Sequence, residues 1–181
     1  MTTQLSAADK AARQKAVVAR AIEFLGTEET PRGSNRGREV DRFLLSVHCP
    51  PGNPWCMAFA YSMFDGAAYT TANGVTFLIP TASCQLQANH AKSVGILVSA
   101  IDARRKLDAG WVMLKWDAEL GRYAHTGIVE SYNSVTGAFL CIEGNTNKDG
   151  SREGYLVARQ TRRIDAIGSD GHPMYAFIQT A

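Results

Sequence analysis

The sequence contains no apolar run that approaches the roughly 20 residues needed to cross a bilayer, which excludes a transmembrane helix. Residues 1–26 also lack the apolar core of a secretory signal peptide. We therefore expect a protein that is made in the cytoplasm and has no membrane partner. It either acts there or reaches its site of action after cell lysis, export or injection.

An excess of charge of one sign is also missing. The 181 residues include 19 Lys and Arg and 17 Asp and Glu, which gives a net charge of +2. Nucleic-acid-binding surfaces need a strong basic excess, so this composition argues against nucleic acid as a partner. With 45% hydrophobic and 20% charged residues, the chain can bury a core and is not expected to be disordered.

Cysteine is sparse and lacks the spacing of a metal site. The four cysteines lie at positions 49, 56, 84 and 141, and no two of them form a C-x-x-C pair. A chain of this length does not depend on a disulfide framework, and structural zinc sites use closely spaced cysteine pairs. We therefore expect reduced thiols, no metal and no cofactor.

Internal repeats, low-complexity tracts and Pro/Ser-rich linkers are absent, which predicts one domain over residues 1–181. The N-terminal half of the chain has a helical pattern. Apolar residues recur at helical spacing over 18–25, just before a glycine that favours a helix end. A second short helix is expected over 40–47, capped by Ser34 or Asn35.

The segment WCMAFAYSMF at 55–64 is apolar on nearly every side, which is typical of a buried helix. Asn53 is suited to cap this helix, and Pro54 is suited to its first position. These assignments place Cys56 in the first helical turn.

Beyond residue 80 the pattern predicts one helix followed by strands. Thr81 can cap the helix, which is expected over 82–92. Alternation of period two then indicates strands over 111–116, 125–132, 138–144, 155–160 and 174–180. Because helices precede an antiparallel sheet, the sequence predicts an α+β fold in which N-terminal helices pack on the sheet.

Cys56 combines a nucleophilic side chain with a helix start. The thiolate is the reactive form of cysteine, and the positive end of a helix dipole lowers the thiol pKa. Free N–H groups at the same helix end can stabilise an oxyanion during acyl transfer. Cys56 is therefore a candidate nucleophile, although a buried cysteine is also often only a small core residue.

The hairpin that follows His125 brings this residue opposite residues 143–145. Glu143 and Asn145 are expected to share a face of the strand, because side chains alternate with period two. A carboxylate or amide beside a histidine can hold one ring nitrogen and direct the other toward a nucleophile. The alternative is a strand-edge histidine with a solvated glutamate, since sequence alone does not fix the register.

The other reactive and aromatic residues favour structural roles. We expect surface or structural positions for His48, His90 and His172, core positions for Cys84 and Cys141, a solvated face for Arg104, Arg105 and Lys106, and core or cleft positions for Trp55, Trp111 and Trp116.

Three sequence blocks occur in the order found in one enzyme family. They are WCMAF at 55–59, HTGIV at 125–129 and EGN at 143–145. Together they resemble the CHAP domain (cysteine, histidine-dependent amidohydrolase/peptidase), a papain-like branch related to NlpC-type cell-wall peptidases. The segments SNRGREVDRFL and PTASC also look like phage and bacterial members, so the resemblance covers residues 15–147.

The resemblance implies a papain-like CHAP fold and an enzyme that hydrolyses an amide in the peptide part of bacterial peptidoglycan. Cys56 would be the nucleophile, His125 the general base, Glu143 the residue that orients the imidazole, and Asn145 an assisting residue at the same end of the site. The bond would be the N-acetylmuramoyl-L-alanine amide or one in the peptide stem or cross-bridge. Such enzymes include phage endolysins and secreted antibacterial effectors, and an effector would have a secretion partner or an immunity or inhibitor protein.

Two departures from the family pattern leave other functions open. Many members carry a G-D dipeptide where this chain has LDAG at 107–110, and some bind calcium through clustered aspartates where this chain has only Asp41. One alternative is a cytoplasmic papain-like amidase that acts on a small amide. The other is a catalytically inactive wall-binding module, against which the intact Cys, His, Glu and Asn argue.

Overall fold

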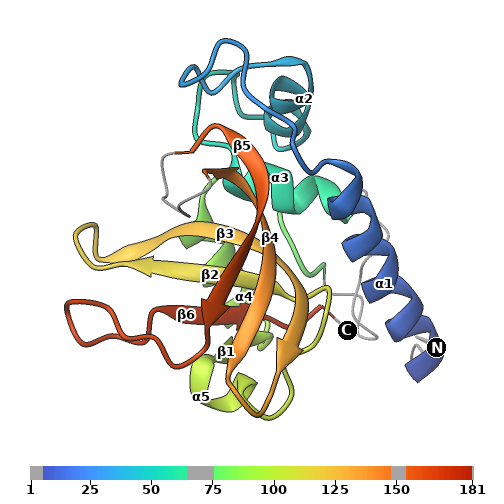
Figure 1. Ribbon diagram of the computed structural model, residues 1–181, viewed down its shortest axis with the longest axis vertical. Helices are drawn as coiled ribbons and strands as arrows, with labels where there is room; N and C mark the ends of the chain where they lie inside the picture. The colour runs from blue at the N-terminus through green and yellow to red at the C-terminus, as the bar shows by residue number, and fades with distance from the viewer. Residues whose placement is uncertain (1–5, 65–75, 148–153, 181) are drawn as a thin grey trace.

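The computed structural model describes residues 6–64, 76–147 and 154–180, which form five helices and six strands. In chain order the elements are α1 (Ala7–Glu23), α2 (Arg38–Ser46), α3 (Cys56–Met63), α4 (Cys84–Ser93), β1 (Leu97–Ser99), α5 (Ala100–Ala103), β2 (Val112–Asp117), β3 (Arg122–Asn133), β4 (Ala138–Thr146), β5 (Leu156–Arg163) and β6 (Tyr175–Ile178). Figure 1 shows α2 and α3 at one end of the sheet and α5 at the other. None of the helices in these ranges has both the length and the apolar character of a membrane span.

The six strands form one antiparallel sheet in the order β1-β6-β2-β3-β4-β5. The last strand of the chain, β6, therefore lies between β1 and β2. Strand β3 is the longest at 12 residues, and helices α1, α3 and α4 all contact it. Helices on an antiparallel sheet confirm the predicted α+β class.

Apolar side chains cover both faces of the sheet. Leu114 and Ile128 lie on one face, in a core completed by helices α1 to α4. Met113 and Val129 lie on the opposite face, in a second core that includes α5. Because both faces are covered, residues next to one another in a strand are buried in different cores, which explains the apolar run at 112–114 in β2.

Helix α3 begins at Cys56, so Cys56 lies in the first turn as predicted, but Asn53 is not the cap and Pro54 is not the first helical residue. Trp55 is the N-cap residue, and no side chain caps the helix. The Asn53 amide instead donates a hydrogen bond of 2.8 Å to the carbonyl oxygen of Pro50 within the preceding loop. The helix start is held by tertiary contacts rather than by a local cap.

Close packing on β4 fixes the position of α3. A Cβ atom at Gly144 would lie 2.7 Å from Cβ of Phe59, so the helix approaches the strand where no side chain intervenes. Trp55 is completely buried, and its indole N–H donates to the Glu29 carboxylate at 2.9 Å. Six of the eight residues of α3 are buried, which confirms the predicted buried helix.

Two other predicted caps are wrong by two or three residues. Gly37 is the N-cap of α2, in place of Ser34 or Asn35. Ser83 is the N-cap of α4, in place of Thr81. The Ser83 hydroxyl accepts the Leu86 N–H, whereas no side chain caps α2, so a cap prediction based on side-chain acceptors fails there.

Three features of the second half of the chain differ from prediction. Strand β1 and helix α5 are three and four residues long, too short to show a periodicity. Strand β3 begins at Arg122, so His125 lies inside the strand rather than at its start. There it pairs with Lys115 of β2.

Candidate active site

Cys56 lines a pocket of about 280 Å³ at the N-terminal end of α3. The residue is only 4% exposed. Cys84, the first residue of α4, lines the same pocket, so the starts of two helices converge on it. Both helix ends favour negative charge near the pocket.

His125 and Glu143 form a buried pair across strands β3 and β4. The Nε2 atom of His125 lies 2.7 Å from Oε2 of Glu143, and the two residues are 1% and 0% exposed. Gly127 provides the space, because a Cβ atom there would lie 2.6 Å from Cγ of Glu143. The structure thus brings together the histidine and the carboxylate that the hairpin register predicts as neighbours.

Arg162 of β5 binds Glu143 as a third member of this buried cluster, and it is not among the residues predicted from the sequence. Its Nε and Nη2 atoms donate to the two carboxylate oxygens of Glu143 at 2.9 and 2.7 Å. Burial by itself raises the pKa of Glu143, but hydrogen bonds and charges from His125 and Arg162 lower it below its usual value. Glu143 is therefore a carboxylate at neutral pH, held in one orientation by a bidentate arginine.

The protonation of His125 follows from its two neighbours. Burial by itself lowers the pKa of His125, but hydrogen bonds to Cys56 and Glu143 and their negative charges raise it to about 9. Its Nδ1 atom is buried without a hydrogen-bond partner of standard geometry in the described ranges. Because Glu143 holds Nε2, Nδ1 is the nitrogen that remains for Cys56.

Cys84 is a second thiol at the site that the sequence prediction assigned only to the core. Its Sγ atom lies 3.8 Å from Sγ of Cys56. This hydrogen bond, followed by that of His125, holds the pKa of Cys56 well below its usual range even though burial raises it. The shared hydrogen bond and burial raise the pKa of Cys84, so of the two thiols Cys56, which also interacts with His125, is favoured to ionise.

The side chain of Asn145, the expected assisting residue of the site, contacts the start of α3 rather than the imidazole. It makes no hydrogen bond to His125 or Glu143; its side chain accepts from the Trp55 N–H at 3.2 Å and donates to the Gly154 carbonyl at 2.6 Å. A backbone φ of 54° at Asn145 and a register shift after Glu143 break the strand alternation on which the prediction depends. Asn145 thus anchors the residue before Cys56, rather than the imidazole.

The remaining sequence candidates lie away from these contacts. His48 and His172 are exposed, and the ring of His90 bonds to the Thr76 carbonyl at 2.8 Å. Cys141 is completely buried in the second core, as predicted. No group of three or more His, Cys, Asp or Glu arranged to hold a metal ion is found in the described part of the chain.

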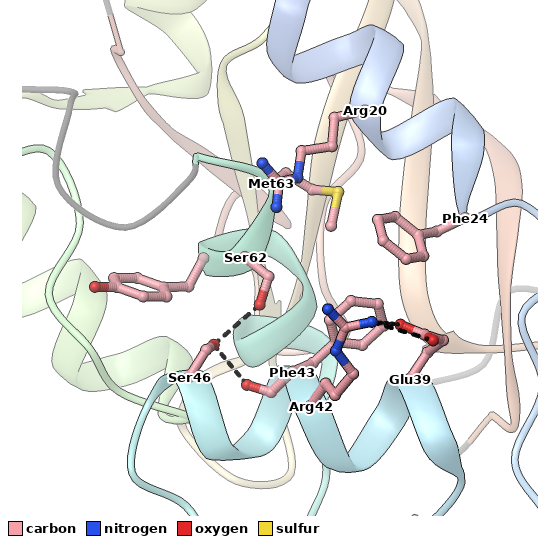
Figure 2. Close-up of a pocket in the computed structure, with 9 residues that line it drawn as sticks. Arg20, Phe24, Glu39, Arg42, Phe43, Ser46, Ser62 and Met63 are labelled. Atoms are coloured by element: carbon pink, nitrogen blue, oxygen red, sulfur yellow. Dashed lines mark hydrogen bonds and ion pairs between the residues drawn. The ribbon is translucent and has the colours of Figure 1, made fainter.

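A second pocket, of about 300 Å³, lies between α1, α2 and the C-terminal half of α3 (Figure 2). Four of its polar side chains form two pairs. Arg42 and Glu39 form an ion pair at 3.0 Å, and the hydroxyls of Ser46 and Ser62 are 3.0 Å apart. No cysteine or histidine is among the described residues that line this pocket.

Comparisons of the chain with protein-family models, with curated proteins and with solved structures find no match.

Proposed function

We propose that this protein is a papain-like cysteine amidohydrolase of the CHAP type, which hydrolyses an amide bond in the peptide part of bacterial peptidoglycan. The observation that carries the reaction class is the connected set formed by Cys56, His125 and Glu143. Cys56 is the first residue of helix α3, and the His125 imidazole interacts with the Cys56 thiol. The Glu143 carboxylate bonds to Nε2, the ring nitrogen on the other side of the imidazole. The substrate class rests on the three sequence blocks that resemble CHAP domains.

The first step uses the charge distribution of the resting site. A lowered pKa at Cys56 and a raised pKa at His125 favour a thiolate beside an imidazolium at neutral pH. The thiolate attacks the amide carbonyl, and the negative charge that develops on oxygen is stabilised by N–H groups at the start of α3. Nδ1–H of His125 then donates its proton to the leaving amine.

The second step regenerates the thiolate. The neutral imidazole accepts a proton from a water molecule, and the resulting hydroxide attacks the thioacyl carbonyl to release the acid. Throughout both steps Glu143 fixes the ring orientation and the tautomer through Nε2. Arg162 keeps Glu143 charged and in place.

Digestion of purified peptidoglycan tests the proposal, with fragments identified by mass spectrometry. The wild type is expected to release fragments, and Cys56→Ala is expected to lower the rate by roughly four orders of magnitude or more. Cys49→Ser is the matched control, because Cys49 lines the same pocket but makes no hydrogen bond to Cys56 or His125.

Either of two results would count against the proposal. Full activity of Cys56→Ala would remove the nucleophile assignment. Absence of cleavage by the wild type across several wall chemotypes, together with turnover of small soluble amides, would replace peptidoglycan with a small-amide substrate.

A further inference from the structure

Among the described residues, one cationic side chain lines the pocket beside Cys56. Arg122, the first residue of β3, is exposed and lines the pocket together with Cys56 and Cys84. No Asp or Glu of the described ranges is among the lining residues. The pocket therefore contains a permanent positive charge as well as the nucleophile.

The Arg122 guanidinium has no protein partner in the described ranges. Asp117 lies directly opposite it across strands β2 and β3. The Asp117 carboxylate instead accepts the backbone N–H groups of Glu119 and Leu120 at 3.1 and 3.0 Å. No described residue therefore competes with an anion in the pocket for the donors of Arg122.

We propose that Arg122 binds a carboxylate of the substrate close to the scissile amide, so that the enzyme prefers amides flanked by a free carboxylate. This inference rests on the proposed function. A guanidinium binds a carboxylate through two parallel hydrogen bonds, which gives both charge and orientation. Peptide stems of peptidoglycan offer such carboxylates, whereas stems amidated at the same positions do not.

The test compares two soluble stem peptides that differ only in amidation of their free carboxylates. Wild type is expected to show a kcat/KM at least about tenfold higher for the carboxylate form. Arg122→Gln should remove that preference by lowering kcat/KM for the carboxylate form alone, and Arg122→Lys should restore part of it. Arg105→Gln is the control, because Arg105 is an exposed arginine that does not line this pocket.

Equal effects of Arg122→Gln on both peptides, or no effect, would overturn the inference while leaving the proposed function intact. If the wild type cleaves neither peptide, the affinity of Cys56→Ala for each peptide is measured by calorimetry instead. Tighter binding of the carboxylate peptide that is lost on adding Arg122→Gln supports the inference, and equal binding of both peptides refutes it.

The contact between Cys56 and Cys84 carries a second, independent inference. Their sulfur atoms are 3.8 Å apart, and both residues line the pocket, so a small oxidant that enters it meets both thiols. Their helices, α3 and α4, start side by side at this point. A modest shift of either side chain brings the sulfurs within bonding distance.

We infer that Cys56 and Cys84 form a reversible disulfide when the protein meets a peroxide. The Cys56 thiolate attacks a peroxide oxygen, the O–O bond breaks, and hydroxide leaves with a sulfenic acid on Cys56. The Cys84 sulfur then attacks the sulfenic sulfur, and the released hydroxyl leaves as water with the Cys84 proton. The disulfide blocks the nucleophile and protects it from further oxidation, until a thiol reductant restores both cysteines.

Hydrogen peroxide followed by dithiothreitol tests this inference, with peptide mapping by mass spectrometry. In the wild type a peptide linked through Cys56 and Cys84 is expected, and reduction should return most of the starting activity. In Cys84→Ala, peroxide should convert Cys56 to sulfinic and sulfonic acid that dithiothreitol does not reverse. Cys49→Ser should behave as wild type.

The peptide map decides the outcome even if Cys84→Ala has little activity of its own. Lack of a Cys56–Cys84 linkage in the wild type would refute the inference. So would recovery of a free Cys56 thiol in oxidised Cys84→Ala to the same extent as in the wild type.

Discussion

Two pockets of similar size lie along helix α3, one of about 280 Å³ at its N-terminal end and one of about 300 Å³ beside its C-terminal half. In the second pocket Arg42 pairs with Glu39, and the hydroxyls of Ser46 and Ser62 bond to each other (Figure 2). At the first, Cys56 lines the pocket, and Cys56 and the buried His125 behind it shift each other's pKa. The two pockets therefore differ little in volume. They differ in their described lining residues, because only the first is lined by a cysteine whose pKa is perturbed.

The largest expected effect is that of His125→Ala, which removes the base that interacts with Cys56. We expect kcat/KM on a cleavable wall peptide to fall by roughly four orders of magnitude, because the Cys56 thiol loses its proton acceptor and the leaving amine loses its proton donor. Ser62→Ala changes the other end of the same helix and should leave kcat/KM within a factor of about two. Comparable losses in both variants would mean that the fold of α3, rather than the site, was being measured.

Glu143→Gln tests the buried side of the site. It keeps the shape of the side chain but removes the charge that His125 and Arg162 share, and disruption of a buried ion pair typically costs about 3–5 kcal/mol of stability. Activity should fall as pH rises through the His125 pKa of about 9, because the imidazolium then loses its proton. Loss of the Glu143 charge should move this alkaline limb to lower pH. An unchanged limb in the pH profile would separate Glu143 from the histidine.

The sequence predicts much of this arrangement wherever neighbouring positions determine it. Strand alternation and the hairpin after His125 are sufficient to place Glu143 beside it, and the apolar segment places Cys56 at a helix start. Arg162 lies on another strand, and its role depends on the buried charge of Glu143 after β4 and β5 pair. Cys84 reaches Cys56 only because α3 and α4 pack on the same strand. Those contacts are set by tertiary packing rather than by local pattern.

Asn145 gives a smaller effect that concerns the start of α3. Asn145→Gly tolerates the positive φ but loses the hydrogen bonds to the Trp55 N–H and the Gly154 carbonyl. We expect a loss of about 1–3 kcal/mol in the free energy of unfolding, measured by urea titration. The alkaline limb of the pH profile should stay in place, because Asn145 does not bond to His125. A shift of the alkaline limb would show that Asn145 influences the pKa of His125.

The smallest effect is expected in the second pocket. Arg42→Ala removes an ion pair with Glu39 in which the arginine is 69% exposed, and such surface pairs contribute about 0.5 kcal/mol or less. Both thermal stability and kcat/KM should remain close to wild type. A marked loss of activity in this variant would show that the pocket takes part in substrate binding after all.

The rate at which iodoacetamide alkylates each cysteine, measured by mass spectrometry across pH, tests the central claim without any substrate. Cys56 should react fastest of the four cysteines at pH values well below the usual thiol pKa, because His125 and Cys84 stabilise its thiolate. In His125→Ala this advantage should shrink, and the onset of Cys56 alkylation should move to higher pH. If Cys56 reacts no faster than Cys49 near neutral pH, or if His125→Ala leaves its profile unchanged, the thiolate–imidazolium pair does not exist and the proposed active site is wrong.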